Sequence, residues 1–273
     1  MSTESRNPRS TGLDKMSALD MVRLMNQEEA QVLKALTQAE DKLSQAAEKA
    51  AEAFRSGGRV VYVGAGTSGR IAMADAAEMP PTFGIEPDRF VAIVSGGDAA
   101  SDKAVEAAED DEHAAIMAMN EIEVKRPDVV IGIAASGRTP FVVAAIRHAR
   151  QKGVWTCGIA NNKQTPLEEA ADLGIVLDTG PEILTGSTRL KAGTAQKLAL
   201  NRISTVAMVL AGKVVENLMV DVKAKNQKLK ERCARIVREL TTATFDEAWE
   251  LLDANAWDVR KVVQTLREAS SLN

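Results

Sequence analysis

Apolar residues recur at helical spacing through the first part of the chain. From about Ser17 to Phe54 they fall at intervals of three and four residues, which predicts helix. Because this stretch is long for one globular helix, we expect a break near Asn26-Gln27 or Thr37-Gln38. Gly57-Gly58 is then expected to end the helical segment.

The pattern next changes to short apolar runs that alternate with helical stretches. The predicted strands are Arg59–Val63, Phe90–Val94, Asp128–Ile133, Val154–Ile159 and Gly174–Leu177. The helical stretches between them lie near Arg70–Ala77, Ala100–Met119, Pro140–Gln151 and Pro166–Ala171. Such alternation predicts an α/β fold with a parallel sheet covered on both faces. Right-handed crossovers favour a doubly wound, five-stranded sheet in the flavodoxin-like order 2-1-3-4-5.

Further helices are expected after the fifth strand. Lys191–Ala211 is a long apolar helical stretch, Val222–Leu240 is strongly charged, and Thr242–Leu272 has the pattern of a small helical module with its own apolar cluster. We therefore divide the chain into an N-terminal helical segment (1–56), an α/β domain (57–221) and C-terminal helices (222–273).

Composition excludes several classes of protein. Hydrophobic residues make up 45% and charged residues 26% of the 273 residues, as in soluble globular proteins. A net charge of −4 argues against a general nucleic-acid binder. The first residues lack the apolar segment of a signal peptide, and no apolar run has the length of a membrane span. Cys157 and Cys233 are isolated, so we expect a reducing cytoplasm.

Two similar loops carry the first functional signal. Gly64–Arg70 and Ala134–Pro140 each follow a predicted strand and lead into a helix, which is how proteins present backbone N–H groups and hydroxyls to an anion. Tight turns with helix-capping hydroxyls are the alternative. Because the loops follow the first and third strands, where the strand order reverses, we favour a phosphate or sugar-phosphate site. The candidate ligand-binding residues are Thr67, Ser68, Gly69, Ser136, Gly137 and Thr139.

The first loop also matches the dinucleotide pattern G-x-G-x-x-G. The second predicted strand, however, runs into Ser95-Gly96-Gly97 with no acidic residue at its end. A dinucleotide site is therefore disfavoured, since an acidic residue there would bind the ribose.

Glu78 is a candidate general acid. Pro80 and Pro81 predict that its helix ends just after it, which leaves the carboxylate at the negative end of the helix dipole. With Met79 and Phe83 as apolar neighbours, the protonated form of Glu78 is favoured. A solvated surface glutamate is the alternative. In the acidic run 106–112 the pattern singles out no residue.

The segment Gly180–Lys197 is rich in hydroxyl, amide and basic side chains before an apolar helix. Some of them must cap that helix, yet there are more than a cap needs, so we favour a binding loop. Its candidate residues are Glu182, Ser187, Thr188, Lys191 and Gln196. His113 and His148 have no partners at ligand or triad spacing, so we expect no metal and no Ser-His-Asp set.

Taken in order, these motifs resemble the N-acetylmuramic acid 6-phosphate etherase family, which is built on the sugar isomerase (SIS) domain and is related to the glucokinase regulator. The matching stretches are Thr3–Asn7, Glu78–Gly84, Gly180–Lys197, 217–223 and the two loops, Gly64–Arg70 and Gly132–Pro140. Ala77 and Met79 stand where the family commonly has Ser and Cys.

The resemblance implies a carbon–oxygen lyase of amino sugar catabolism that removes D-lactate from the C3 ether and gives N-acetylglucosamine 6-phosphate. It implies that Glu78 is the acid, that Glu109 is the second catalytic glutamate, that 57–221 is the SIS domain and that the tail is ubiquitin-associated-like. Paired subunits are also implied, and the long apolar helices support a homodimer because they exceed what a five-stranded sheet needs for cover.

The implied chemistry needs only two carboxyl groups. The lactyl ether is β to the C1 aldehyde of the open-chain sugar, so a base can remove the acidified C2 proton while an acid protonates the departing oxygen. We therefore expect a phosphorylated amino sugar as the ligand, with no cofactor, no nucleic acid and no membrane. The alternatives are a sugar-phosphate isomerase on the same fold and a non-catalytic sugar-phosphate sensor. Both predicted glutamates argue against the sensor.

Overall fold

The computed structural model describes residues 2–97, 106–224 and 226–271, and it divides into two compact units. Unit 1 comprises Met1–Ala76 and Asp88–Ala207, and unit 2 comprises Ala77–Pro87 and Met208–Asn273. Each unit is described by itself. The three-part division expected from the sequence stays a prediction.

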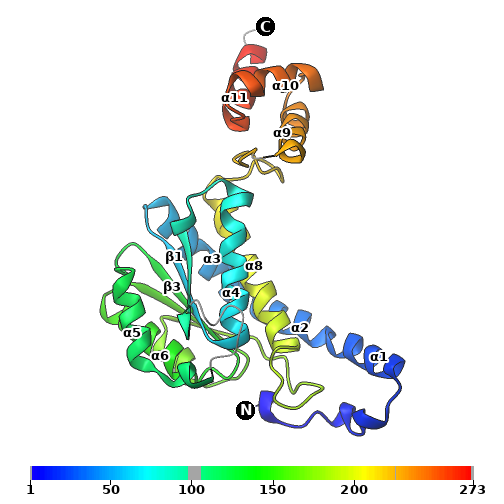
Figure 1. Cartoon of the computed structure of the whole chain (residues 1–273), viewed down its shortest axis with the longest axis vertical. Helices are drawn as coiled ribbons and strands as arrows, with labels where there is room; N and C mark the ends of the chain where they lie inside the picture. The colour runs from blue at the N-terminus through cyan, green and yellow to red at the C-terminus, as the bar shows by residue number, and fades with distance from the viewer. Residues whose placement is uncertain (1, 98–105, 225, 272–273) are drawn as a thin grey trace. The chain divides into compact units, whose positions relative to one another are not determined.

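Unit 1 contains a five-stranded, all-parallel sheet in the order β2-β1-β3-β4-β5 (Figure 1). The strands are β1 (Val60–Gly64), β2 (Phe90–Val94), β3 (Val129–Ala134), β4 (Trp155–Ala160) and β5 (Leu173–Val176). Each lies within one residue of its predicted bounds, and the doubly wound order is confirmed.

The helices of the chain also follow the predicted pattern. Those outside unit 2's C-terminal bundle are α1 (Ala18–Glu28), α2 (Ala30–Gln38), α3 (Glu40–Arg55), α4 (Gly66–Phe83), α5 (Glu112–Glu121), α6 (Pro140–Gln151), α7 (Pro166–Ala170) and α8 (Lys191–Leu210). Short 3₁₀ helices cover Ser2–Glu4, Pro8–Ser10, Leu13–Lys15, Pro87–Arg89 and Glu106–Asp110. The N-terminal helical stretch was expected to break at one of two places, and it breaks near both, at Glu29 and Ala39. Part of the helix predicted over Ala100–Met119 lies outside the described residues.

Helices cover both faces of the sheet. On one face, α6 packs on β1, β3 and β4, with α5 beside it. On the other face, α3 packs on β1, β3 and β5 (Figure 1). Side chains alternate along β1, so Val61 and Val63 join the α5–α6 core. The core is built largely from small and aliphatic residues, because the chain has few aromatic ones. Fully buried alanines of α3, such as Ala46 and Ala50, let the backbone of this helix approach the sheet closely.

Unit 2 includes a three-helix bundle: α9 (Gln227–Leu240), α10 (Phe245–Ala254) and α11 (Val259–Ser271). Its core contains Leu252 and Val262 from the tail, where an apolar cluster was expected, together with Cys233 and Val237 of α9. Thr244 and Glu247 form a capping box at the start of α10. Helix α9 begins at Gln227 rather than at Val222, because Asn226 caps it there.

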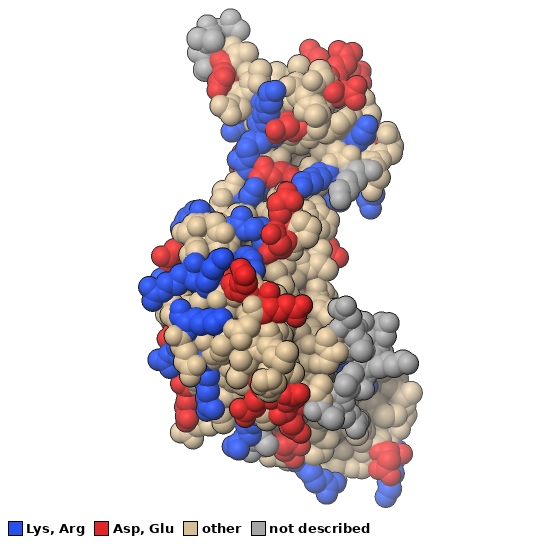
Figure 2. Space-filling view, turned by 60° about the vertical axis from the view of Figure 1, so that its left-hand side comes forward, with Lys and Arg blue, Asp and Glu red and all other residues tan. Residues whose placement is uncertain are grey.

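Charged side chains of both signs are interspersed on the face drawn in Figure 2, rather than gathered into one continuous basic surface. Across the parts of the chain that the structure describes, no helix is both long and apolar enough to span a membrane.

Candidate functional site

The two loops begin side by side at the carboxyl edge of the sheet. Strands β1 and β3 are parallel neighbours, with Gly64 opposite Ile133, so the loops that follow them leave the sheet at the same edge (Figure 1). The strand order reverses between these strands, since β1 is followed by β2 on one side and by β3 on the other. This is where ligands bind in open α/β sheets.

The glycines of the first loop are required by its tight geometry. A Cβ on Gly64 would lie 2.8 Å from the Cα of Gly69, and a Cβ on Gly69 would lie 2.6 Å from Cγ1 of Val94. Ser68 is buried in this turn, and the methyl group of Thr67 lies beside Gly193 in α8. The loop therefore contacts the downstream segment that the sequence also indicated.

Glu109 reaches the same loop from the 3₁₀ helix Glu106–Asp110. A Cβ on Gly66 would lie only 2.9 Å from its Oε1, so the carboxylate lies against the first turn of α4. Burial raises the pKa of Glu109 above its ordinary value, and the charge of Asp110 raises it further, whereas Arg70 lowers it. A half-buried carboxylate with a raised pKa has the properties of a general base.

The second loop is held by backbone and side-chain hydrogen bonds. The backbone N–H of Arg138 donates to Ser136 Oγ (3.1 Å), and Ala135 O accepts from the backbone N–H of Asn161 (3.0 Å). Gly137 has a φ of +66°, and a Cβ there would collide with Thr165. Thr139 precedes α6 without a capping hydrogen bond from its side chain, so capping does not account for this hydroxyl.

The predicted binding residues of the downstream segment Gly180–Lys197 also make contacts within the protein. Glu182 is fully buried and accepts from the backbone N–H groups of Lys191 (3.1 Å) and Ala192 (2.9 Å), which caps α8. Burial raises the pKa of Glu182, while these two hydrogen bonds lower it. Ser187 and Thr188 are half-buried in the turn before α8, and the N–H of Gly193 donates to Thr188 O. Ligand binding by Glu182, Ser187, Thr188 and Lys191 stays a prediction.

Lys191 forms a buried ion pair that sequence reasoning missed. Its Nζ lies 2.5 Å from Glu28 Oε2, and both side chains are buried. Asn7 Nδ2 and Arg9 also donate to Glu28, each at 2.8 Å, and the amine and guanidinium groups lower the pKa of Glu28 against its burial. No local pattern indicates this cluster, because the pair is separated by 163 residues.

The prediction that the two prolines end the helix after Glu78 is wrong. Helix α4 continues to Phe83, and the N–H of Gly84 donates to Pro80 O (2.9 Å). The helix therefore runs through both prolines, although neither can donate a hydrogen bond to the carbonyl four residues earlier. Glu78 is exposed on the part of α4 that belongs to unit 2, while Met79 and Phe83 are buried.

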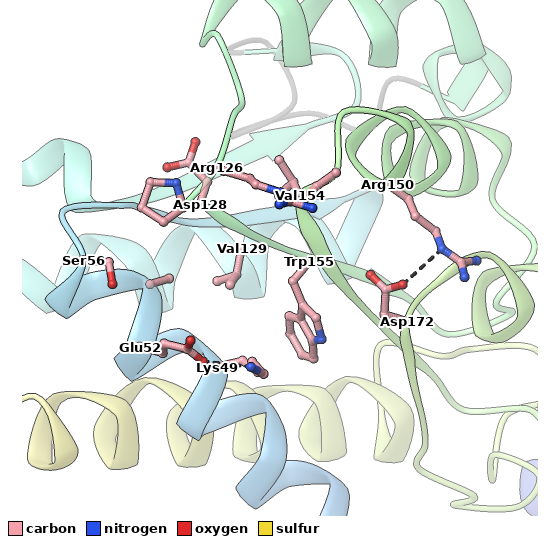
Figure 3. A pocket seen from close by; sticks show the side chains of 13 residues that line it. Lys49, Glu52, Ser56, Arg126, Asp128, Val129, Arg150, Val154, Trp155 and Asp172 are labelled. Atoms are coloured by element: carbon pink, nitrogen blue, oxygen red, sulfur yellow. Dashed lines mark hydrogen bonds and ion pairs between the residues drawn. The ribbon is translucent and has the colours of Figure 1, made fainter.

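The opposite, amino edge of the sheet holds a cavity of about 670 Å³ (Figure 3). Its charged lining residues pair with neighbours: Lys49 with Glu52 (2.8 Å), and Arg150 with Asp172 (3.1 Å). Because the cavity lies at the amino edge, it is separate from the two loops, which follow the carboxyl ends of β1 and β3. Within the described residues, no group of three His, Cys, Asp or Glu side chains could hold a metal ion.

Comparisons with known proteins give the family. The glucokinase regulatory protein N-terminal SIS domain matches residues 42–150, and the SIS domain matches residues 100–203. N-acetylmuramic acid 6-phosphate etherase of Geobacillus thermodenitrificans is 48% identical over 98% of this chain and 91% of its own length. The Lactobacillus gasseri etherase is 43% identical over the whole chain and 92% of its own length.

Solved structures agree on the fold alone. A putative phosphosugar isomerase from Bacteroides fragilis, 21% identical, has a TM-score of 0.55 over 74% of this chain and 95% of its own. A phosphoheptose isomerase from Francisella tularensis, 16% identical, has the same TM-score over 70% of this chain and 98% of its own. Since the etherases match nearly the full chain at almost half its positions, the protein belongs to the N-acetylmuramic acid 6-phosphate etherase family.

Proposed function

We propose that this protein is an enzyme that cleaves the D-lactyl ether of N-acetylmuramic acid 6-phosphate, giving N-acetylglucosamine 6-phosphate and D-lactate. The identity of 48% to an etherase of that name, over 98% of the chain, carries the proposal. The carboxylate of Glu109 against the first loop supports it, because the reaction requires a base next to the bound sugar. As a carbon–oxygen lyase, the enzyme belongs to amino sugar catabolism in the cytoplasm.

The 6-phosphate binds at the carboxyl edge between β1 and β3. Ser68 and Ser136 donate hydroxyl hydrogen bonds to it, and the surrounding backbone of both loops adds N–H donors. The positive end of the α4 dipole, at Gly66, favours the anion there. The remaining proposed contacts come from Thr67, Gly69, Gly137, Thr139, Glu182, Ser187, Thr188 and Lys191.

Glu109 acts as the base and Glu78 as the acid. Glu109 takes the C2 proton of the open-chain sugar, the electrons pass into the C2–C3 bond, and the C3–O bond breaks. Glu78 gives its proton to the departing lactate oxygen. Water then adds to C3 of the unsaturated aldehyde, and a proton returns to C2. No electrons are gained or lost overall, and the two carboxyl groups return to their starting states.

Isotopes test this mechanism. In ¹⁸O-water the label is expected at C3 of the product sugar, and in D₂O deuterium is expected at C2. Label in the lactate hydroxyl would mean attack at the lactyl carbon and would contradict elimination. In Glu78→Gln, C2 exchange should continue while lactate release stops. A sugar-phosphate isomerase would exchange the C2 proton without releasing lactate, and a sensor would do neither.

The proposed enzyme is a homodimer. On unit 1, a groove lined by α2, α3 and α8 includes Leu36 and Leu43, and its rim exposes 60% of Leu33 and 41% of Val206. Covering exposed apolar side chains is favourable, and a second copy of the chain supplies a matching apolar surface. Sedimentation equilibrium should give twice the chain mass at micromolar concentration. A monomer mass would contradict the homodimer.

A further inference from the structure

Residues Ser2–Asn7 pack on the carboxyl edge of the sheet, and we call them the N-terminal strap. Thr3 is fully buried and Asn7 is buried, whereas Glu4, Ser5 and Arg6 between them are exposed. These two buried side chains anchor the strap and make it part of the fold.

Thr3 is joined to the second loop through one side-chain amide. Asn162 Nδ2 donates to Thr3 Oγ1 (2.9 Å) and also to Ala135 O (2.9 Å), which directly precedes Ser136. Its Oδ1 accepts from the backbone N–H of Thr3 (3.4 Å). An amide nitrogen has two hydrogens, so the strap and the loop use both of them.

The strap also contacts the downstream segment. Asn7 Nδ2 donates to Pro181 O (3.3 Å), and a Cβ on Gly186 would lie 3.2 Å from Glu4 Oε2. Figure 1 shows the blue N-terminal residues beside the yellow-green segment that precedes α8. The strap therefore lies against two of the three segments proposed to bind the substrate.

We propose that Thr3 is a positioning residue for the sugar-phosphate site. Acting through Asn162, it fixes the carbonyl of Ala135 and so holds Ser136 and the loop backbone in their anion-binding geometry. This inference rests on the proposed binding of the 6-phosphate by the second loop. Without the Thr3 hydroxyl, one buried hydrogen of Asn162 has no partner, and the amide gains freedom to rotate away from Ala135.

The test compares two buried threonines. In Thr3→Val we expect N-acetylglucosamine 6-phosphate to bind roughly threefold to tenfold more weakly by calorimetry, as for one lost hydrogen bond. The KM for N-acetylmuramic acid 6-phosphate should rise similarly with little change in kcat, and Thr3→Ser should restore both. Thr156→Val is the matched control: its buried hydroxyl donates to Asp172 (2.8 Å) at the amino edge. We expect it to lower the melting temperature but to leave sugar-phosphate affinity unchanged.

Unchanged affinity in Thr3→Val would overturn the inference, as would an equal loss of affinity in Thr156→Val, which would show a general effect of stability. The calorimetric measurement does not depend on turnover. A wild-type protein that binds the sugar phosphate but releases no lactate would therefore overturn the proposed reaction and leave the role of Thr3 testable. Absence of any sugar-phosphate binding would overturn both.

Discussion

The two edges of the sheet hold their polar side chains in different ways. At the amino edge, the cavity of about 670 Å³ is lined by charges that pair with each other, such as Arg150 with Asp172. At the carboxyl edge, the carboxylate of Glu109 lies against the first loop, and burial raises its pKa. The side chain of Thr139 makes no capping hydrogen bond to α6. Among the described residues, the buried hydroxyls of Ser95 and Thr179, which follow β2 and β5, also have no hydrogen-bond partner.

The largest difference between the two edges is therefore in how their charges are engaged, and the site proposed above lies at the edge with the less engaged groups. Exposed ion pairs such as Lys49 with Glu52 contribute little free energy, but they leave few charges free to recognise a ligand. Polar groups that the fold does not satisfy are the ones available for binding and catalysis. Matched substitutions at the two edges test this difference between them.

The largest effect is expected from Glu109→Gln. An amide cannot accept the C2 proton, so kcat for lactate release should fall about 10²- to 10⁴-fold while the fold is retained. Glu52→Gln, in the amino-edge cavity, is the control and should leave kcat near the wild-type value. Near-normal turnover in Glu109→Gln would exclude this residue as the base.

Lys191→Met tests a carboxyl-edge residue that the fold itself uses. Removing the ammonium group leaves Glu28 buried with fewer partners, so the free energy of unfolding should fall by about 3 kcal/mol. Urea denaturation measures this loss. If Lys191→Met keeps wild-type stability, the ion pair does not stabilise the fold, and a loss of substrate affinity alone would assign Lys191 to the ligand.

Ser136→Ala tests the phosphate site directly. One charge-assisted hydrogen bond is lost, which corresponds to about 1.5–3 kcal/mol of binding free energy and appears as a higher KM. Ser56→Ala, at the amino-edge cavity, should have no such effect. Equal weakening for phosphorylated and unphosphorylated sugars would show that Ser136 does not bind the phosphate.

Sequence reasoning recovers local features and misses those made by distant residues. Short apolar runs predict all five strands, and the two loops after β1 and β3 leave the sheet at the edge where we propose the site. Pro80 and Pro81 indicate the end of a helix, whereas α4 continues through both of them to Phe83.

Pairings across the chain leave no periodic signal at all. The ion pair of Lys191 with Glu28 joins residues 163 apart, and the contact of Thr3 with Asn162 joins residues 159 apart. The cap that engages Glu182 and the ion pair that engages Lys191 likewise become visible only in the fold. The helical stretch near Ala100 lies partly outside the described residues.

The smallest expected effect is a shift in pH dependence. Burial and the charge of Asp110 raise the pKa of Glu109 above 4.5. A base acts only when deprotonated, so kcat/KM should fall as the pH drops through this raised pKa. The same raised pKa means that Glu109 takes up its proton more readily in the folded state, so its contribution to stability declines as the pH rises above 4.5.

Asp110→Asn removes one of the two causes of the raised pKa. The acid limb of the kcat/KM profile should therefore move to lower pH, and stability above that limb should rise slightly. Asp172→Asn, which removes a carboxylate at the amino edge, should leave the limb in place although it breaks the pair with Arg150. If both variants move the limb equally, net charge controls the profile. A limb that moves only in Asp110→Asn assigns it to Glu109, because Asp110 adjoins that carboxylate and Asp172 lies at the other edge.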